Sequence, residues 1–587
     1  MLPDQLIEAE LKQATQSLFS KTIDLQIQPT NPEFEGTHTL VCFPIAKISG
    51  QAPDATAKLI GEWLINNSKI VTAFNVVKGF LNLSLKDDVW LDVFQSFICA
   101  PEFGTRKANG KEIIIEYSSP NTNKPLHLGH LRNNFLGFSV AEIFDALGYK
   151  VHRVQIINDR GIHICKSMAA WQLYGNGETP ESSGIKGDHL VGKYYVAFDK
   201  QYRQEIAELK LKGIPEETAE KEAPIMRLAV SMLQQWEQKD SAILELWKKM
   251  NGWVYKGFSE TYQRMGVHFE KLYYESETYL LGKEEILNGL EKGVFFKKDD
   301  GSVWVDLTSD GLDQKVLLRS DGTSVYMTQD VGTAILRFRD FPNTEGQVYT
   351  VGNEQEYHFR VLFLILKKLG FVWADKCYHL SYGMVDLPTG KMKSREGTVV
   401  DADDLMNEMV TEAAAQSKEL GKGAPSDALN EMVGLGALKY FLLKVDPKKR
   451  MMFNPAESIQ LQGNTGPFIQ YTHARICALL RKATEQNIHT TYTGGMQEIQ
   501  SSERILIALL VRYPAILAEA AASYAPSVVA NYAYALAKEY NQFYQQVRIF
   551  GEPDAKKVQF RLTLSAKVSG IIRLAMSHLG IGVPEVM

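Results

Sequence analysis

The sequence contains few cysteines, and none of them forms a C-x-x-C pair. Its five cysteines lie far apart along the chain, at Cys42, Cys99, Cys165, Cys377 and Cys477. Zinc knuckles and disulfide frameworks both need cysteines at short, regular spacings, so the sequence argues against either class. We expect these cysteines to be buried and to act as small hydrophobic residues.

Long hydrophobic runs and a strong charge of one sign are also missing. The longest uncharged apolar stretch that we identify lies near residues 361–366 and is far too short to cross a bilayer. The N-terminal segment MLPDQLIEAELKQ carries acids and no apolar core, unlike a signal peptide. The formal charge is −5, so a nucleic-acid partner needs a local basic surface. We expect a cytoplasmic protein without a membrane partner.

The composition that is present is typical of a globular chain. At about 150 residues per domain, the 587 residues predict three or four domains. Hydrophobic residues make up 45% and charged residues 23%, which allows sizeable cores. The 44 glycines and 21 prolines are close to average usage, which excludes collagen and argues against large-scale disorder.

A strand, a helix and a second strand are predicted in residues 111–159. KEIIIEYSS (111–119) is a continuous apolar run, as in a buried parallel strand. The apolar spacing of residues 129–148 is helical, and the final Gly148 suits a C-cap. Residues 151–159 form the second predicted strand. This βαβ unit predicts a doubly wound parallel sheet of the Rossmann-like (HUP) kind.

The regular pattern is interrupted after residue 174. Residues 193–254 form a charged helical stretch of the kind inserted between the halves of a sheet. Strand patterns resume at 302–307, 316–318 and 347–351, followed by a helical pattern at 359–370. From residue 402 to the end the pattern is almost entirely helical. We therefore expect an α/β catalytic domain with an insertion, an N-terminal α/β domain and a C-terminal all-α bundle.

The most informative segment is SSPNTNKPLHLGHLR, residues 118–132. Its HLGH motif, His127 to His130, falls where the predicted strand gives way to the predicted helix. A helix N-terminus offers N–H groups and a positive dipole end to a triphosphate. Gly129 lets a flat base approach the backbone, and both imidazoles can donate to phosphate oxygens. The tetrapeptide alone would favour a helix start with two surface histidines.

A second basic motif, GKMKSREGTVV at 390–400, follows the second half of the predicted sheet. A glycine-flanked loop that presents Lys391, Lys393 and Arg395 can close on phosphates. A short basic loop alone is usually solvated, but this one stands on the expected side of an insertion from HLGH. The two motifs together predict a nucleotide-phosphate site.

The two motifs resemble HIGH and KMSKS of class I aminoacyl-tRNA synthetases, and the chain resembles the arginyl-tRNA synthetases in particular. Six blocks in the same order carry the resemblance: EYSSPNTNKPLHLGHLRNNFLG, NDRG, SDGTSVYMTQDVG, EQEYHF, QGNTGPFIQYTHARI and LGIGVPEVM. The resemblance covers essentially the whole chain. It implies activation of L-arginine with ATP to arginyl-adenylate, release of pyrophosphate, and transfer of arginine to the 3′ end of tRNA(Arg).

The resemblance also implies which residues handle ATP. Positioning and charge stabilisation supply the catalysis, and Mg²⁺ arrives with ATP without a dedicated protein metal site. The implied catalytic residues are Lys124, His127, His130, Lys391 and Lys393, and the implied ATP contacts are His127, Leu128, Gly129, His130, Met392 and Ser394. The family motif has a lysine where Ser394 stands. Lys124, Lys393 or both could replace it.

An arginine pocket follows from the charge of the substrate and from the resemblance. A guanidinium is planar and permanently cationic, and it prefers carboxylates in fork geometry. The implied arginine-binding residues are Glu116, Ser118, Asn121, His130, Tyr326, Asp330 and Gln355. Alternatively, Glu116 is an ordinary strand-end acid and Asp330 a helix N-cap. A pocket that satisfies every guanidinium donor rejects lysine without an editing domain.

The sequence indicates the RNA-binding residues less specifically than it indicates the residues that bind ATP and arginine. Residues 436–485 contain eight Lys or Arg against three acids, which is a candidate surface for the RNA backbone. The resemblance places Phe80 and Asn82 near the tRNA elbow, and Tyr471 and Tyr544 are candidates to stack on anticodon bases. For Tyr540, Phe543 and Tyr544, helix-core packing is the better interpretation because of their i, i+3, i+4 spacing.

The expected domain division has four parts: 1–108, an N-terminal domain for the tRNA elbow; 109–400, the catalytic domain with an insertion at about 174–315; 401–458, a helical connector; and 459–587, the anticodon-binding bundle. We expect a monomer. Three rivals stay open: a class I synthetase for lysine, an RNA-binding paralogue that has lost activation, and a nucleotidyltransferase that shares only the HxGH half-site.

Overall fold

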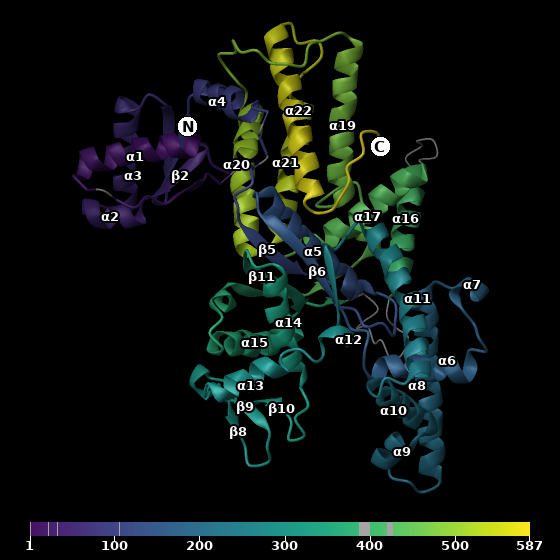
Figure 1. Ribbon diagram of the computed structural model, residues 1–587. Helices are drawn as coiled ribbons and strands as arrows, with labels where there is room; N and C mark the ends of the chain where they lie inside the picture. The colour runs from purple at the N-terminus through teal and green to yellow at the C-terminus, as the bar shows by residue number, and fades with distance from the viewer. Residues whose placement is uncertain are drawn as a thin grey trace.

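The computed structural model describes the whole chain except residues 1, 22, 32, 102, 105, 387–399 and 420–425. Five residues of the predicted phosphate site, Lys391, Met392, Lys393, Ser394 and Arg395, lie outside the described residues. Figure 1 shows an N-terminal unit to one side, a central sheet, helical segments below it and a group of long C-terminal helices above it.

The N-terminal unit packs three helices against an antiparallel sheet. The helices are α1 (Pro3–Phe19), α2 (Phe43–Ser49) and α3 (Pro53–Asn67). The strands β1 (Ile27–Pro29), β2 (His38–Val41), β3 (Val71–Val77) and β4 (Phe80–Leu85) have the order β1-β2-β4-β3. This unit confirms the expected α/β N-terminal domain. It is followed by α4 (Asp87–Val93) and the π-helix η1 (Phe94–Ile98), both of which contact α20 (Ser501–Ser523).

A five-stranded parallel sheet forms the centre of the molecule. Its strands are β5 (Glu112–Glu116), β6 (Lys150–Ile157), β7 (Lys271–Tyr274), β11 (Thr344–Gly352) and β12 (Cys377–Tyr382), in the order β12-β11-β5-β6-β7. Helix α5 (Leu128–Ala146) connects β5 to β6, so the predicted βαβ unit is confirmed. Gly148 ends this connection. Only glycine fits there, because φ is 86° and an added Cβ would lie 2.2 Å from the carbonyl oxygen of Lys107.

Two segments, rather than one, interrupt the core sheet. The first is helical and lies between β6 and β7: α6 (Ile162–Tyr174), α7 (Pro180–Ser183), α8 (Gly187–Leu211), α9 (Glu216–Glu222), α10 (Pro224–Glu237) and α11 (Ser241–Met265). The second follows β7 and contains α12 (Glu275–Thr278), α13 (Lys283–Glu291) and a small antiparallel sheet of β8 (Phe296–Lys297), β9 (Val303–Val305) and β10 (Lys315–Leu318). The single insertion expected at about 174–315 is therefore corrected, because β7 lies within that range and belongs to the core sheet.

Two helices flank β11 in the chain and complete the catalytic region. They are α14 (Tyr326–Asp340) and α15 (Glu356–Lys368), and a 3-10 turn, η3 (Asn353–Gln355), links β11 to α15. Both helices belong to a separate apolar cluster that includes Val331, Ile335, Phe359 and Leu362. The two helices are in contact, and a hydrogen bond of 2.6 Å between Asp330 of α14 and His358 of α15 brings their first turns together.

The C-terminal part is helical, as predicted. Its helices are α16 (Ala402–Glu419), α17 (Asp427–Leu443), α18 (Pro455–Ser458), α19 (Gly466–Glu485), α20, α21 (Pro526–Gln546) and α22 (Ala555–Ser577). The exception is a short parallel pair of β13 (Val385–Asp386) and β14 (Met451–Met452). In Figure 1 the long helices α19 to α22 stand together above the sheet, and α20 and α21 contact α5.

Helix α20 corrects the expectation that no apolar segment is long enough to cross a bilayer. Its length and mean hydropathy are sufficient for a membrane span. It also packs against α21 and α22, and Leu506, Leu510 and Tyr513 on its buried face are fully covered. Core helices of soluble bundles share this length and composition, so α20 by itself is weak evidence for a membrane.

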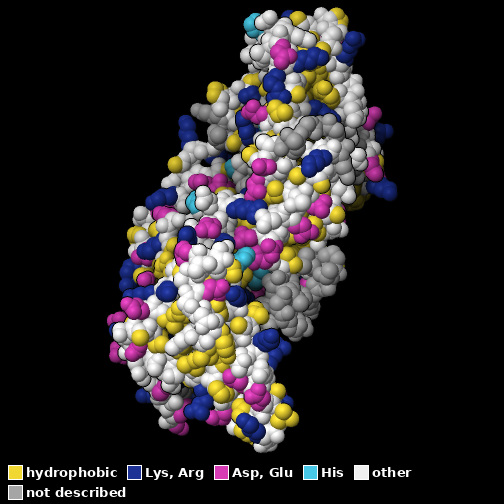
Figure 2. Space-filling view, turned by 90° about the vertical axis from the view of Figure 1, so that its right-hand side faces the viewer, with side chains coloured by type: hydrophobic (Ala, Val, Ile, Leu, Met, Phe, Trp, Pro, Cys, Tyr) yellow, Lys and Arg dark blue, Asp and Glu magenta, His cyan; other side chains and the backbone are white. Residues whose placement is uncertain are grey.

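The five cysteines are free in this structure. Cys42 and Cys165 are buried, whereas the other three are half-buried. Figure 2 views the molecule from the side of the α6–α11 segment and shows acidic and basic side chains mixed over this face, with hydrophobic side chains gathered in its lower half. The mixture agrees with the small net charge of the chain.

Candidate active site

The predicted site residues gather at the carboxyl edge of the core sheet. Strands β5, β6, β7 and β11 run parallel and therefore end at the same edge. The order of the strands reverses at β5, since β6 and β7 extend the sheet on one side and β11 and β12 on the other. Ligands of doubly wound sheets bind in the crevice at such a switch point.

The HLGH segment forms a reciprocal cap at the start of α5. His127 is the N-cap residue, and its Nδ1 accepts a hydrogen bond from the Gly129 N–H at 3.1 Å. His130 Nδ1 in turn accepts from the His127 N–H at 3.1 Å. The two rings lie with their centroids 3.9 Å apart. A Cβ on Gly129 would approach Cε1 of His127 to 3.0 Å, so this glycine makes room for the His127 ring.

Both imidazoles are neutral and carry their proton on Nε2. Burial, together with the positive charge of Lys124, lowers the pKa of His127 to about 4. Burial and the neighbouring His127 and Lys124 hold the pKa of His130 well below its usual value. A neutral imidazole has one N–H, and Nδ1 is the acceptor in both rings, so Nε2 is the donor. Two fixed Nε2–H donors can stabilise negative charge that develops on a bound phosphate.

The backbone at the start of α5 corrects one prediction. The Leu128 N–H donates to the carbonyl of Val400, and the N–H groups of His130 and Leu131 donate to the carbonyl of His127. With Gly129 bound to His127, the first four N–H groups of the helix all have partners within the chain. The expected use of free helix N–H groups for a triphosphate is therefore wrong. The Leu128 side chain is fully buried, so its predicted contact with ATP is not supported either.

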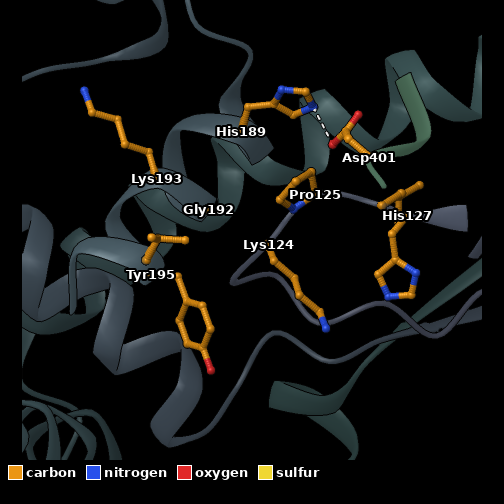
Figure 3. Close-up of a pocket in the computed structure, with 10 residues that line it drawn as sticks. Lys124, Pro125, His127, His189, Gly192, Lys193, Tyr195 and Asp401 are labelled. Atoms are coloured by element: carbon orange, nitrogen blue, oxygen red, sulfur yellow. Dashed lines mark ion pairs between the residues drawn. The ribbon is translucent and has the colours of Figure 1, made fainter. Parts of the chain in front are cut away.

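A cavity of about 260 Å³ adjoins the HLGH segment. Lys124, Pro125, Leu126 and His127 line one side of it, and His189, Gly192, Lys193, Tyr195 and Val196 of α8 line the other, with Asp401 beside them. Figure 3 shows Lys124 and His127 across this space from Tyr195 and Lys193. The cavity therefore lies between the residues predicted to bind phosphate and the helical segment that connects β6 to β7.

The chain resumes beside HLGH after the undescribed residues 387–399. Ala402 N–H donates to the Leu126 carbonyl at 3.0 Å, and His127 and Asp401 form an antiparallel bridge. The residues that directly follow the predicted lysine loop are therefore paired with the segment that leads into α5.

On the other side of the switch point, Tyr326, Asp330 and Gln355 lie at the starts of α14 and α15. Tyr326 is 75% exposed and begins α14, and Asp330 follows one turn later. Asp330 Oδ2 accepts a hydrogen bond from Nε2 of His358 at 2.6 Å. The N-cap of α14 is Val325, so the alternative that Asp330 is a helix N-cap is wrong. His358 is a partner that the sequence analysis missed, although it lies within the EQEYHF block.

Glu116 and Ser118 differ from their predicted roles. Glu116 forms an ion pair with Arg337 of α14, and both side chains are almost fully buried. Ser118 Oγ is hydrogen-bonded to the Tyr262 hydroxyl at 2.7 Å and is buried. Their predicted contacts with arginine are corrected, because these polar groups are buried and engaged within the chain. Asn121, by contrast, is exposed.

A further acid, Glu275, approaches the site from β7. It begins α12 directly after that strand and is half-buried. Burial raises the pKa of Glu275 to about 7, opposed by Arg160 and reinforced by the carboxylates of Asp159 and Asp330. Asp159 accepts hydrogen bonds from the Ser276 N–H at 2.9 Å and its hydroxyl at 2.8 Å, which fixes α12. The sequence analysis missed Glu275 because the four-residue strand before it is too short to show a pattern.

The chain matches family models over most of its length. The model described as tRNA synthetases class I (R), catalytic domain, matches residues 95–454. The DALR anticodon binding domain matches residues 469–587, and the arginyl tRNA synthetase N terminal domain matches residues 4–85. The chain belongs to the arginyl-tRNA synthetases. This membership excludes the rival readings as a lysine synthetase and as a nucleotidyltransferase family member.

Full-length relatives agree with this family. The chain is 56% identical to an arginine–tRNA ligase of Flavobacterium psychrophilum, with 99% of each chain covered, and 56% identical to one of Bacteroides thetaiotaomicron, with 96% covered. Among solved structures, the Thermus thermophilus arginyl-tRNA synthetase has a TM-score of 0.78 at 24% identity over 100% of both chains. The Plasmodium falciparum arginyl-tRNA synthetase has a TM-score of 0.73 at 20% identity over 99% of both chains. These structures confirm the fold of an arginyl-tRNA synthetase.

The residues predicted to contact tRNA in this arginyl-tRNA synthetase differ from one another in exposure. Asn82 is buried and bonded to Thr39 and Asn75, so its predicted tRNA contact is corrected. Phe80 is half-buried against the ring of Phe43. In the basic segment 436–485, Lys439 is buried and donates to the carbonyl of Gly580, which removes one charge from the expected surface.

Two aromatic residues of the anticodon-binding domain lie close to one half-buried arginine, Arg475. The Arg475 guanidinium lies 4.9 Å from the ring centre of Tyr471 and 5.5 Å from that of Tyr544. Tyr544 is 39% exposed, whereas Tyr540 and Phe543 are fully buried. Helix-core packing is therefore confirmed for Tyr540 and Phe543, and Tyr544 lies on the outer side of the same helix.

Proposed function

We propose that the chain joins L-arginine to the 3′ end of tRNA(Arg) in two steps, both in the crevice at the carboxyl ends of β5 and β11. In the first step the arginine carboxylate attacks the α-phosphorus of ATP. The bond to the β,γ-phosphates breaks and pyrophosphate leaves, which gives arginyl-adenylate. In the second step the terminal ribose hydroxyl of the tRNA attacks the arginyl carbonyl, and AMP leaves.

The reciprocal cap of His127 and His130 is the observation that carries this proposal. Each Nδ1 is held as an acceptor by a backbone N–H, which turns each Nε2–H into a fixed donor. Such donors stabilise charge on the phosphates without reorganising during the reaction. Lys124 lines the same cavity and is positioned to meet the leaving pyrophosphate. Lys391 and Lys393 stay predicted partners in this step, as do Met392 and Ser394 in binding ATP.

Arginine would be bound by the acids on the opposite side of the crevice. Asp330, held by His358, and Glu275 can both face a guanidinium, which needs more than one carboxylate oxygen. Tyr326 and Gln355 are exposed at the same helix starts, and Asn121 is exposed in the loop after β5. Asn121 would hold the α-amino group. Glu116 would act indirectly, because its ion pair with Arg337 anchors α14 to β5.

The anticodon of tRNA(Arg) would contact Tyr471, Arg475 and Tyr544. A guanidinium between two tyrosine rings can offer a cation to the backbone and flat faces to unstacked bases. Phe80 of the N-terminal domain stays a candidate for the tRNA elbow. Mg²⁺ would arrive bound to ATP. We also expect the enzyme to be cytoplasmic and monomeric.

The test is ATP–pyrophosphate exchange with each of the twenty amino acids, with and without total tRNA. Exchange with arginine alone among the amino acids would support the assigned substrate. A requirement for tRNA would add that activation is coupled to tRNA binding. Exchange with another amino acid would contradict the pocket, and no exchange under either condition would favour the paralogue that has lost activation.

A further inference from the structure

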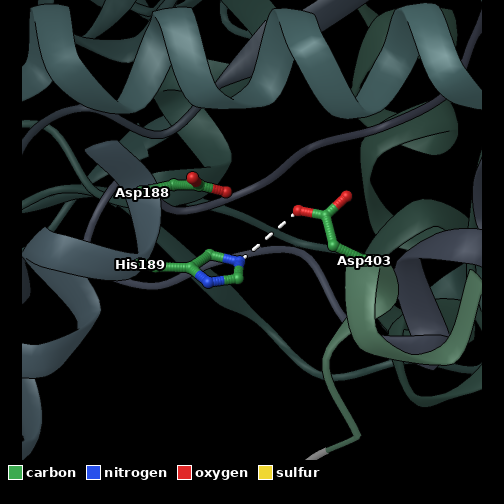
Figure 4. A group of neighbouring side chains, drawn as sticks. All are labelled: Asp188, His189 and Asp403. Atoms are coloured by element: carbon green, nitrogen blue, oxygen red, sulfur yellow. Dashed lines mark ion pairs between the residues drawn. The ribbon is translucent and has the colours of Figure 1, made fainter. Parts of the chain in front are cut away.

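A charged network at the start of α8 lies directly beside the HLGH segment. His189 Nε2 is 3.2 Å from Asp401 Oδ2 and 3.4 Å from Asp403 Oδ2. Lys186, the N-cap residue of α8, places its Nζ 2.6 Å from the same Asp403 oxygen. Figure 4 shows His189 facing Asp403 across the gap between α8 and the start of α16. Two cations of the β6–β7 segment thus hold two acids that follow residues 387–399.

The network resembles a metal site in its spacing only. Asp188, His189 and Asp403 could offer ligand atoms that lie within 4.8 Å of one another. The Lys186 ammonium, however, lies 2.6 Å from Asp403 and 3.3 Å from Asp188. The ammonium group therefore occupies the position between the two carboxylates that a bound metal ion would need. Hydrogen bonds to Asp401 and Asp403 raise the pKa of His189 to about 10, so its ring is also protonated. A divalent ion there would be repelled by both cations, so we interpret the group as a charge-compensated contact.

The acids held by this network are joined by the backbone to the catalytic segment. Asp401 forms an antiparallel bridge with His127, and its two neighbours bond to Leu126 and Leu128. Asp401 Oδ1 also accepts from the Asp403 N–H at 2.8 Å, which caps α16. Any shift of Asp401 would therefore move the backbone on which the reciprocal histidine cap is built.

Helix α8 also touches the other end of this segment. A Cβ on Gly192 would lie 2.7 Å from Cδ of Pro125 and 3.6 Å from Cα of Lys124. Helix α8 therefore contacts this segment directly at Lys124 and Pro125, and through Asp401 at the bridge with His127. Thr261 of α11 completes the attachment by donating to Asp403 Oδ1 at 3.2 Å.

We propose that His189 is a positioning residue for adenylate formation, because its contact with Asp401 fixes the Lys124–His130 segment against α8. The inference rests on the proposed role of that segment in binding ATP. His189 acts through Asp401 and not on the substrate. The β6–β7 segment is, in this view, part of the machinery that aligns the histidine donors with the phosphates.

The kinetic test separates positioning from stability. His189→Ala should lower kcat for arginine-dependent pyrophosphate exchange about tenfold, since an error of 1 Å in placing reacting groups can cost about 100-fold. The KM for arginine should stay close to wild type, because Asp330 and Glu275 lie on other elements. Rates are normalised to the folded enzyme by active-site titration. Lys200→Ala, on the exposed face of the same helix, is the matched control and should behave as wild type.

A double-mutant cycle tests the route through Asp401. Asp401→Asn keeps the Oδ1 acceptor that caps α16 and removes the charge that faces His189. It should lower kcat to a similar degree, and the pair of changes together should be no worse than the stronger single change. His189→Lys, which keeps a cation opposite the two acids, should recover most of the rate.

Each outcome decides the proposal. Unchanged kcat in folded His189→Ala, or losses that multiply in the double variant, would overturn it. If His189→Ala does not fold, His189→Gln replaces it in the same cycle, with the same expected non-additivity. If the wild type shows no arginine-dependent exchange, the proposed function fails instead, and the variants are then compared by the change in ATP affinity that the same shift of Lys124 would cause.

Discussion

The two sides of the catalytic crevice differ in how far their polar groups are already bonded. On the ATP side, His127 and His130 cap each other, and His189 is paired with two acids. On the arginine side, Tyr326 is 75% exposed, and Asp330 is hydrogen-bonded to His358. Polar groups that are already hydrogen-bonded within the chain are oriented before the substrate binds, whereas exposed polar groups gain their partners from the substrate. Changes on the ATP side should therefore act on kcat, and changes on the arginine side on KM.

The largest effect is expected from His130→Ala. The change removes an Nε2–H donor and also leaves the His127 N–H without its acceptor. Loss of one such donor costs about 100- to 1,000-fold in kcat. The measurement is pyrophosphate exchange at saturating arginine and ATP. A normal rate would remove this histidine from the mechanism and would break the contrast between the two sides.

Asp330→Asn tests the arginine side of the crevice, where we expect a change in the KM for arginine and not in kcat. A charged hydrogen bond is worth about 1.5–3 kcal/mol, so the KM for arginine should rise about 10- to 150-fold. The KM for ATP should be nearly unchanged. Asp321→Asn is the matched control, since Asp321 is an exposed acid in the turn before α14. Unchanged arginine kinetics in Asp330→Asn would show that the pocket is misplaced.

The pH dependence of arginine binding gives a smaller effect. Glu275 has a pKa raised to about 7 and must be ionised to attract a guanidinium. The kcat/KM for arginine should therefore fall as the pH drops below 7, by about tenfold per unit at the limit. His127, with a pKa of about 4, stays neutral over that range and adds nothing.

Glu275→Gln provides the check on this assignment. The variant should have a lower kcat/KM for arginine that no longer depends on pH between 8 and 6, as measured in the same exchange assay. A pH profile identical to that of the wild type would assign the titration to another group. The KM for ATP serves as the internal reference.

The smallest effect is expected from Gly192→Ala. The new Cβ would lie 2.7 Å from Pro125, so α8 and the Lys124 segment must separate slightly. We expect a loss in kcat of about threefold, well within the cost of small misplacements. Gly252→Ala is the matched control: Gly252 also lies inside a helix, and its added Cβ would meet nothing within 4 Å. Equal kinetics for the two variants would contradict the close approach of α8.

The sequence predicted those features that depend on local pattern. The apolar run at β5, the helical spacing of α5 and the helical C-terminal part are written in neighbouring residues, and the structure confirms each of them. The position of HLGH at a junction of strand and helix follows from the same local patterns. The family resemblance, carried by contiguous blocks, was confirmed by the matched models.

The tertiary structure decided which groups meet. Glu116 and Arg337 are 221 residues apart, and only the packing of α14 on β5 makes them an ion pair instead of leaving Glu116 for the substrate. The same holds for Val400, which takes the N–H of Leu128, and for Glu275, which reaches the site from a strand too short to be recognised. The sequence by itself determined the longer elements, such as β5, α5 and the C-terminal helices, because local periodicity and capping depend on near neighbours. Only the fold determined which polar groups remain for substrates, because burial and long-range pairing depend on residues far apart in the chain.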